Sequence, residues 1–194
     1  MPPNRACVMK VLVKYGLDTG AGYELLADSS ILPTGRPLFI PDWAHHFAGT
    51  LAVAVRISRL GKCIAPRFAH RYWDGFTASL VTRGQAADGD TIDIQALSRG
   101  HDGALLLGQM VPASALEQDG ALLRWMVNNQ PVGQMGLHGM GDIVNTTISH
   151  VSNYMTLKMG DLLCLCGDAT GQLAIGTTTE ITLGNQALLR MHIK

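Results

Sequence analysis

The segment TLAVAVRI, residues 50–57, alternates between two kinds of side chain. Successive side chains of a β-strand point to opposite faces, so a period of two predicts a strand. One face of this strand carries only large aliphatic residues, which are Leu51, Val53, Val55 and Ile57. The other face carries Thr50, Ala52, Ala54 and Arg56. We therefore expect one face in a core and a turn at Leu60-Gly61.

Further short apolar runs predict most of the remaining strands. These runs are residues 9–17, 103–111, 121–135, 161–167, 173–183 and 187–194. Residues 72–94 combine a strand-like centre with a loop rich in Gly and Asp at 84–91. Turn-forming residues at 128–131 and 183–186 predict hairpin turns within this series.

One segment has the periodicity of a helix rather than of a strand. Along residues 141–160 an apolar stripe recurs at intervals of three and four residues, and it consists of Val144, Ile148, Val151 and Met155. Asp142 or Asn145 is the expected N-cap, and Gly160 lies just past the expected end. One helix among many strands predicts a strand-rich α+β domain.

Composition narrows the class of protein. A chain of 194 residues supports one sizeable core, so we expect a single domain over residues 1–194. Lys plus Arg equals Asp plus Glu at 15 each, which offers no basic stripe to nucleic acid. The N-terminus shows no secretory pattern, and no apolar stretch reaches membrane-spanning length. We therefore expect a cytoplasmic protein with neither nucleic acid nor membrane as a partner.

Two smaller compositional signals concern assembly and thiols. Charged residues make up only 15% of the chain, which indicates that part of its surface is buried in an oligomer. The chain has four cysteines, and Cys164 and Cys166 alternate with leucines in a strand-like run. This pattern favours buried, reduced thiols over a metal-binding knuckle.

Several motifs resemble those of the fumarylacetoacetate hydrolase superfamily. The most specific are FIPDW at 39–43, VRISRLGK at 55–62 and ISHVSNYMTLKMGDLL at 148–163. The resemblance extends over nearly all of the chain after residue 25. Residues 1–25 correspond to a shortened N-terminal strand and loop, which lacks the catalytic His that usually follows an Asn-Tyr pair in the family.

The resemblance implies a fold and a chemistry. The fold is a mixed-sheet β-roll with few flanking helices, usually in a homodimer. The chemistry is the cleavage or decarboxylation of acylpyruvate-like or oxaloacetate-like keto acids at a divalent cation. Such a hard cation requires a cluster of oxygen ligands, which the family supplies as Glu-x-Glu on one strand and an Asp on its neighbour.

The positions that carry this chemistry have changed in the present chain. The family's Glu-x-Glu aligns with Thr50-Leu51-Ala52, and its Asp aligns with Val81. The catalytic Lys aligns with Arg99, whose guanidinium does not deprotonate near neutral pH. The family's GTPAG turn is CGDAT at 166–170. These replacements predict that the chain binds no Mg²⁺, Mn²⁺ or Ca²⁺ and needs no other cofactor.

The leading hypothesis is a homodimeric fumarylacetoacetate hydrolase-like protein without catalytic activity, a pseudoenzyme. A pocket for a small anionic ligand, lined by Arg56, Arg83 and Arg99, accompanies this hypothesis. His101 and Asp102 are further ligand-binding candidates if they form a hydrogen-bonded pair that favours a charged imidazole. The alternative interpretation is a glycine-flanked turn in which Asp102 holds backbone amides.

Two other hypotheses come from different classes of protein. One is a divergent metal-dependent hydrolase or decarboxylase of acylpyruvate-like or oxaloacetate-like keto acids, with ligands at positions other than those aligned above. The other is an interaction subunit that pairs with an active paralogue.

Overall fold

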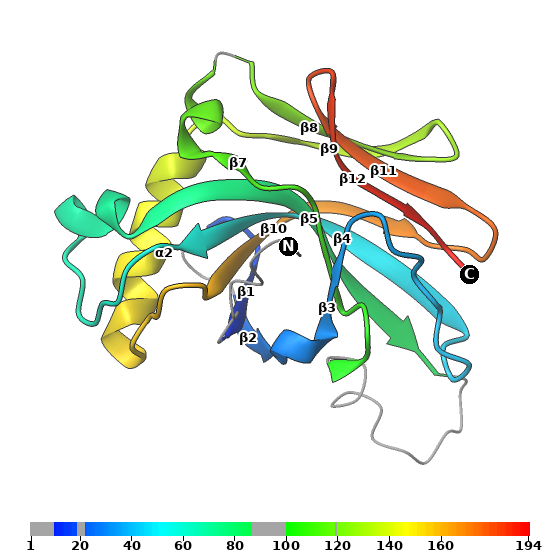
Figure 1. Cartoon of the computed structure of the whole chain (residues 1–194), viewed down its shortest axis with the longest axis horizontal. Helices are drawn as coiled ribbons and strands as arrows, with labels where there is room; N and C mark the ends of the chain where they lie inside the picture. The colour runs from blue at the N-terminus through cyan, green and yellow to red at the C-terminus, as the bar shows by residue number, and fades with distance from the viewer. Residues whose placement is uncertain (1–9, 19–21, 87–99, 119) are drawn as a thin grey trace, which may run out of the picture.

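A computed structural model describes residues 10–18, 22–86, 100–118 and 120–194 of the chain. Within these residues the chain builds a large curled sheet, a small second sheet and one long helix (Figure 1). This architecture confirms the prediction of a strand-rich α+β fold with few helices. The sheet is mixed, because β1 pairs with β10 and β3 with β6 in parallel while β4 pairs antiparallel with β5 and β10.

The large sheet has the strand order β2-β1-β10-β4-β5-β6-β3, with β7 added on β5. Its strands are β1 (Val11–Tyr15), β2 (Tyr23–Leu26), β3 (Ile31–Pro33), β4 (His46–Ile57), β5 (Trp73–Gln85), β6 (Leu105–Leu107), β7 (Val111–Pro112) and β10 (Leu162–Gln172). The long strands β4 and β5 occupy the middle of the sheet (Figure 1). They are therefore the scaffold on which any site inside the roll is built.

The small sheet has the order β12-β11-β8-β9. Its strands are β8 (Leu122–Val127), β9 (Gln130–Gly136), β11 (Thr178–Leu183) and β12 (Gln186–His192). The helices are α2 (Met140–Tyr154) and the 3₁₀ helices η1 (Asp28–Ser30), η2 (Pro66–Arg71) and η3 (Ala113–Glu117). Together, α2 and the small sheet cover one face of the large sheet, which we call the outer face.

The two faces of β4 are those that the sequence predicts. Leu51, Val53, Val55 and Ile57 pack in the main core with residues of α2 and the small sheet. Ala52 and Ala54 point to the opposite side, which we call the inner face, and join a second apolar cluster there. The period of two in the sequence thus separates the inside of the roll from its outer core. The strand itself begins at His46, earlier than the alternation alone indicates.

The helix and the hairpins follow the predicted pattern, with differences at their ends. Val144, Ile148 and Val151 are buried on one side of α2, as predicted. The residue before the helix is Gly139 with φ 72°, so neither Asp142 nor Asn145 is the N-cap. The sequence pattern misses this start because the glycine enters the helix from a left-handed conformation that no side chain signals.

The turn predicted at 128–131 is a tight connection between β8 and β9. Asn128 and Asn129 have φ of 49° and 62°, the left-handed conformation that two-residue hairpins favour in asparagine. Gln130 and Pro131 already belong to β9. The other predicted turn joins β11 and β12 through Gly184, whose φ is 55°.

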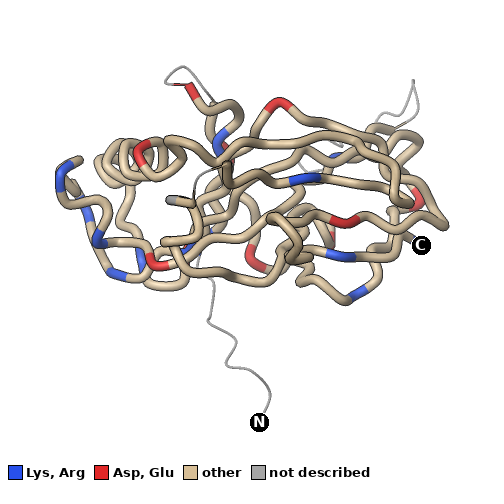
Figure 2. The backbone as a smooth tube through the Cα atoms, turned by 90° about the horizontal axis from the view of Figure 1, so that it is seen from above, with Lys and Arg blue, Asp and Glu red and all other residues tan. Residues whose placement is uncertain are grey.

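Two further features of the fold are the burial of its cysteines and the distribution of its basic residues. Cys164 and Cys166 are buried on the inner face, which confirms the prediction of buried thiols, whereas Cys63 is exposed. Although the net charge is zero, Lys and Arg gather at one end of the molecule, where the exposed Arg59, Lys62, Arg67 and Arg71 surround η2 (Figure 2). Within the described ranges, no helix is long and apolar enough to cross a membrane.

Candidate functional site

The three positions aligned with the family's metal ligands lie together on the inner face. Thr50 of β4 pairs directly with Val81 of β5. Ala52 lies two residues further along β4 and is paired with Ser79 on one side and Cys166 on the other. Residues some 30 positions apart in the chain therefore form one patch, because the β4–β5 ladder brings them opposite each other.

The chemistry of this patch is apolar. Ala52 is 0% exposed and Val81 is 2% exposed, and both belong to the inner cluster with Val13, Cys164 and Cys166. Thr50 is half-buried and contributes the only side-chain oxygen among the three aligned positions. In the part of the chain that the structure describes, no group of three or more His, Cys, Asp or Glu side chains is placed to hold a metal ion. The aligned residues thus do not fit a hard divalent cation, which needs several oxygen ligands.

A charged cluster lies on the inner face beside the patch. Arg83, two residues along β5 from Val81, donates hydrogen bonds from Nη2 to Glu24 Oε2 (2.6 Å) and to Tyr15 Oη (2.7 Å). The Tyr15 hydroxyl in turn donates to Glu24 Oε2 (2.7 Å). The Arg83 guanidinium also lies 4.8 Å from the centre of the Tyr15 ring. Arginine, glutamate and tyrosine thus form one hydrogen-bonded triad.

The curl of the large sheet brings this triad together. Tyr15 is on β1, Glu24 on β2 and Arg83 on β5, and β10 and β4 separate β1 from β5 in the strand order. A flat sheet would place β2 and β5 about 19 Å apart at the usual spacing of neighbouring strands. The contact therefore bridges two walls of the roll. Ala48, which pairs with Arg83 on β4, has a small side chain that leaves space for the arginine.

Burial and neighbouring charge act in opposite directions on the pKa values of the triad. The Glu24 side chain is 8% exposed and that of Arg83 is 44% exposed, so the carboxylate is the more desolvated partner. Burial opposes the charge of Arg83, but the hydrogen bond with Tyr15 and the charge of Glu24 raise the pKa of the guanidinium overall. Burial also raises the pKa of the Tyr15 hydroxyl, although Arg83 acts against this shift. Arg83 is thus a fixed positive charge next to the patch.

The neighbouring thiol responds to the same surroundings. Burial raises the pKa of Cys166 to about 12, and the charge of Arg83 opposes this rise. Cys166 therefore remains a protonated thiol near neutral pH. It contributes neither a nucleophile nor a thiolate ligand to the inner face.

The structure does not bring the predicted anion-binding arginines together. Arg56 donates to Asp74 Oδ1 from Nε (3.0 Å) and from Nη2 (2.9 Å), at an exposed position. Arg83 lies opposite Ala48, eight residues along β4 from Arg56. This separation is about 26 Å at the usual rise of a strand, so the two guanidiniums do not share a pocket. Arg99 lies outside the described residues.

His101 and Asp102 lie apart from the inner patch. The His101 ring contacts Phe47 (5.5 Å between centroids), a residue of the outer core, and its Nε2 lies 3.1 Å from Thr82 Oγ1. Thr82 and Val81 are consecutive on β5, so their side chains point to opposite faces of the sheet. Asp102 is exposed and precedes Gly103, whose φ is 90°. This geometry agrees with the interpretation of a glycine-flanked turn.

Sequence reasoning missed two of the three members of the triad. Tyr15 and Glu24 occur in short apolar strands and match no motif. The available signal was the glutamate itself, since an acidic residue within YELL on a short strand needs a polar partner when its face is buried. The identity of that partner depends on the curl of the sheet.

Comparisons with known proteins give a consistent family and fold. The family model described as fumarylacetoacetate (FAA) hydrolase C-terminal matches residues 25–192. A search of curated proteins finds no match. Among solved structures, a fumarylpyruvate hydrolase from Pseudomonas aeruginosa in complex with Mn²⁺ and pyruvate is similar with a TM-score of 0.79 at 14% identity, over 96% of this chain and 89% of that one.

Two further solved structures share the fold. A 5-carboxymethyl-2-hydroxymuconate delta-isomerase from Mycobacterium smegmatis has a TM-score of 0.74 at 22% identity, over 96% of this chain and 78% of that one. A maleylpyruvate hydrolase from Sphingobium sp. SYK-6 has a TM-score of 0.78 at 17% identity, over 96% and 70%. At these identities the likeness is one of fold.

Proposed function

The chain belongs to the fumarylacetoacetate hydrolase family, and from this premise we propose that it is a member without a divalent metal centre and without the associated cleavage of keto acids. The observation that supports this proposal most directly is the pairing of Thr50 with Val81 beside Ala52, at the positions where the family's three carboxylates align. Apolar and hydroxyl side chains there cannot assemble the oxygen cluster that Mg²⁺, Mn²⁺ or Ca²⁺ needs.

Charge near the patch supports the same conclusion. A divalent cation would sit close to the Arg83 guanidinium, whose positive charge repels it at short range. The nearby Glu24 carboxylate accepts hydrogen bonds from Arg83 and Tyr15 at Oε2, so a metal ion at that oxygen would have to displace both. We therefore propose that the Arg83–Glu24 pair closes the former site in place of a metal.

The same geometry restricts the proposed small anionic ligand. Arg83 is paired with Glu24 and Arg56 with Asp74. An anion at either guanidinium has to compete with a carboxylate already bound. An anion at Arg83 is a second proposal, and its test is whether binding depends on Glu24.

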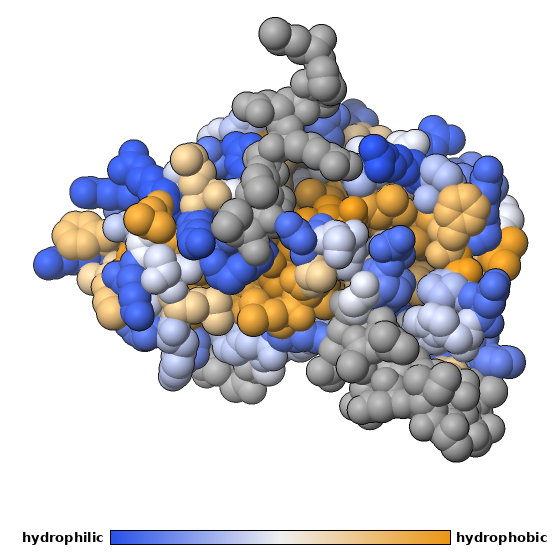
Figure 3. Space-filling view, turned by 60° about the horizontal axis from the view of Figure 1, so that its bottom comes forward, coloured by the Kyte–Doolittle hydropathy of each residue, from blue (hydrophilic) through white to orange (hydrophobic). Residues whose placement is uncertain are grey.

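We also propose that the chain retains the homodimeric assembly that its resemblance to the family implies. The face shown in Figure 3 carries a band of hydrophobic residues between hydrophilic groups. Leu25 (55% exposed) and Phe39 (63% exposed) are large apolar side chains that lie open to solvent, and burying such side chains would stabilise a dimer. Sedimentation of the purified protein at micromolar concentration tests this assembly, and a single monomeric species would refute it.

Calorimetric titration of Mn²⁺ into EDTA-treated protein tests the loss of the metal centre. We expect no binding by the wild type. The variant Thr50→Glu/Ala52→Glu/Val81→Asp restores three carboxylates and should bind one equivalent, more tightly when Arg83→Ala is added. The matched control Thr50→Gln/Ala52→Gln/Val81→Asn has the same shape without the charges and should bind none. Stoichiometric binding by the wild type would contradict the proposal.

An activity assay separates this proposal from the competing enzyme hypothesis. The fumarylpyruvate hydrolase of the same fold is known in complex with Mn²⁺ and pyruvate, so acylpyruvates and oxaloacetate with Mn²⁺ are the substrates to try. We expect no turnover above the uncatalysed rate. Turnover that EDTA abolishes would favour the divergent keto-acid hydrolase or decarboxylase. Co-purification of a related chain from the native host would favour an interaction subunit.

A further inference from the structure

A cavity of about 280 Å³ lies on the outer side of the large sheet, between the strands β1 and β2 and the helix α2. Lys14 and Tyr23, which pair with each other across β1 and β2, contribute from the sheet. Leu17 and Asp18 contribute from the segment that follows β1. The lining residues from α2 are Asp142, Ile143, Thr146, Thr147 and His150.

The helix presents an unusual stripe to this cavity. Positions 143, 146, 147 and 150 follow one another at intervals of three, one and three residues, so they share one side of α2. Three of the four carry a hydroxyl or an imidazole. The adjacent stripe, which includes Val144, Ile148 and Val151, is apolar and packs into the core. Thr147 is buried whereas Thr146 and His150 are exposed, so the polar stripe runs from the core to the solvent-facing side of the cavity.

Opposite charges lie at different depths of the cavity. Lys14 is 4% exposed, and its Nζ donates to the backbone carbonyls of Gly16 (2.9 Å) and Asp18 (2.6 Å). An ammonium has three N–H donors, so one remains for a ligand as far as the described residues show. Burial lowers the pKa of Lys14, and the negative charge of Asp18 opposes this shift. A buried ammonium favours anionic neighbours, and the carboxylate of a ligand would add one. The carboxylates of Asp18 and Asp142 belong to exposed residues at the mouth.

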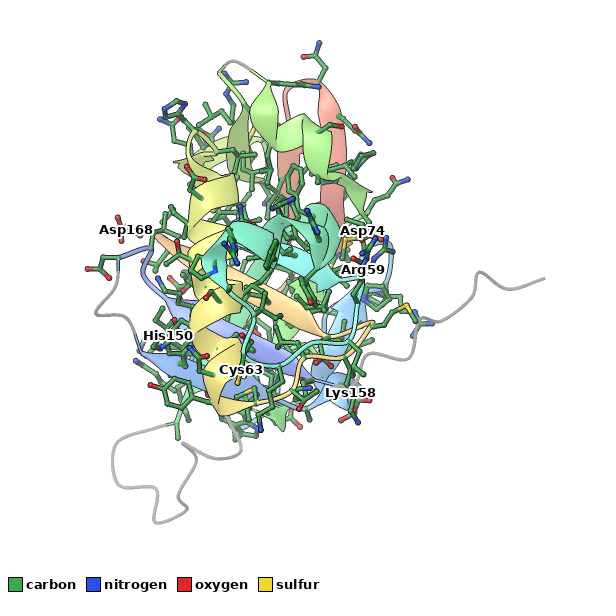
Figure 4. All side chains as sticks on the ribbon, turned by 90° about the vertical axis from the view of Figure 1, so that its left-hand side faces the viewer. Arg59, Cys63, Asp74, His150, Lys158 and Asp168 are labelled. Atoms are coloured by element: carbon green, nitrogen blue, oxygen red, sulfur yellow. The ribbon has the colours of Figure 1, made fainter. Side chains whose placement is uncertain are left out.

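Aromatic rings form one wall of the cavity. The rings of Tyr23 and His150 stack at 5.7 Å between centroids with an interplanar angle of 23°. Tyr154 continues the row, 5.2 Å from His150. Figure 4 shows His150 extending from α2 on the side of β1 and β2. With Leu17 and Ile143, these rings offer an apolar surface to the body of a small ligand.

We propose that this cavity is a binding site for a small amino acid or a similar zwitterion. The carboxylate of the ligand binds the free N–H of Lys14, and its ammonium binds Asp142 or Asp18 at the mouth. Its side chain lies between the Tyr23–His150 wall and the apolar residues. A cavity of this volume is at the small end of ligand sites, which suits a molecule of amino-acid size.

This site is independent of the inner face and of the function proposed above. Lys14 and its neighbours Val13 and Tyr15 alternate along β1, so Lys14 points away from the inner cluster and the Arg83 triad. A protein with or without a metal centre on the inner face can carry the outer cavity. Failure of either proposal therefore leaves the other standing.

Thermal-shift and calorimetric titration with the twenty standard L-amino acids tests the proposal. We expect at least one to raise the melting temperature and to bind with one-to-one stoichiometry. The matched probes lack one charge each: for leucine they are 4-methylpentanoate and 3-methylbutylamine. Each should bind roughly 10- to 100-fold more weakly than its parent, the usual effect of losing a charge-assisted hydrogen bond. No shift with any amino acid at 10 mM, or equal binding of a one-charge analogue, would overturn the proposal.

Variants locate the bound molecule. Thr146→Trp fills the cavity from an exposed helical position and should abolish binding while the protein stays folded. Because either acid can bind the ammonium, the double variant Asp18→Asn/Asp142→Asn should weaken binding of the amino acid but leave binding of the carboxylate probe unchanged. Lys14→Met should weaken binding of the amino acid but leave binding of the amine probe unchanged. Asp102→Asn, an exposed acid in a distant turn, is the matched control. Binding that survives Thr146→Trp would place the ligand elsewhere and refute the site.

Discussion

Replacing Arg83 with methionine should destabilise the protein by about 2–3 kcal/mol. Loss of one partner of a buried ion pair costs about 3–5 kcal/mol, because the remaining charge stays buried without compensation. The Glu24 side chain is 8% exposed and therefore keeps most of that penalty. Arg83 is 44% exposed, so water already weakens the ion pair. The expected loss of stability is therefore at or slightly below the lower end of that range.

Replacing Glu24, the partner of Arg83, should have a smaller effect on stability. Glu24→Leu leaves an arginine that is nearly half exposed and can be solvated by water, so we expect a loss of about 1 kcal/mol. The double variant Arg83→Met/Glu24→Leu removes both charges and replaces them with apolar side chains of similar size. Its stability should fall within about 1 kcal/mol of the wild type. The two substitutions are therefore strongly non-additive.

Urea unfolding of the four proteins at pH 7 measures this double-mutant cycle. The coupling free energy should be about 2 kcal/mol. If the double variant loses as much as the sum of the single variants, the triad is not a coupled unit and the reasoning is wrong.

Three further predictions concern packing, a buried carboxylate and the thiols. Gly171→Ala places a Cβ 2.3 Å from Val132 and 3.0 Å from Trp125, so it should lower the free energy of unfolding in urea by about 1–3 kcal/mol. The control Gly136→Ala has open space around its Cβ and should lower that free energy by less than about 0.5 kcal/mol. Asp161→Asn should cost about 2–4 kcal/mol, because its 2% exposed carboxylate accepts from Lys10 Nζ (2.5 Å) and the Lys158 amide (2.8 Å). Iodoacetamide at pH 8 should label the exposed Cys63 in the native protein. It should label Cys166 only after urea unfolds the protein, because burial raises the pKa of that thiol to about 12.

Each of these predictions has an outcome that contradicts it. Equal stabilities for the two glycine variants would show that the Val132 and Trp125 side chains move aside at little cost. An Asp161→Asn protein as stable as the wild type would show that the carboxylate is solvated. Mass spectrometry that finds native Cys166 alkylated as fast as Cys63 would show that the inner face is open to solvent.

The sequence alone determined the elements that depend on near neighbours. The period of two along residues 50–57 assigns Leu51 and Val53 to the core and Ala52 to the other side, because strand geometry fixes alternate directions. The stripe on α2 and the asparagine turn after β8 are local in the same sense. Motifs in order along the chain were enough to indicate the family and the fold.

The start of α2 shows where local reasoning fails. A polar residue is the usual N-cap, and Asp142 and Asn145 were both available. The helix begins instead after Gly139, where the chain arrives from β9 in a left-handed conformation. The direction of that approach is set by the packing of the small sheet.

The content of the inner site was decided by tertiary structure. Arg56 and Arg83 look equivalent in the sequence, since each lies toward the end of a strand-like run. In the fold, Arg56 meets Asp74 at an exposed position, whereas Arg83 reaches Glu24, 59 residues earlier, across the curled sheet. Pairing across a roll depends on how far the whole sheet bends, and no local pattern encodes that bend. The sequence therefore shows that Thr50, Ala52 and Val81 carry no carboxylate, and only the structure shows that the Arg83–Glu24 pair lies beside them.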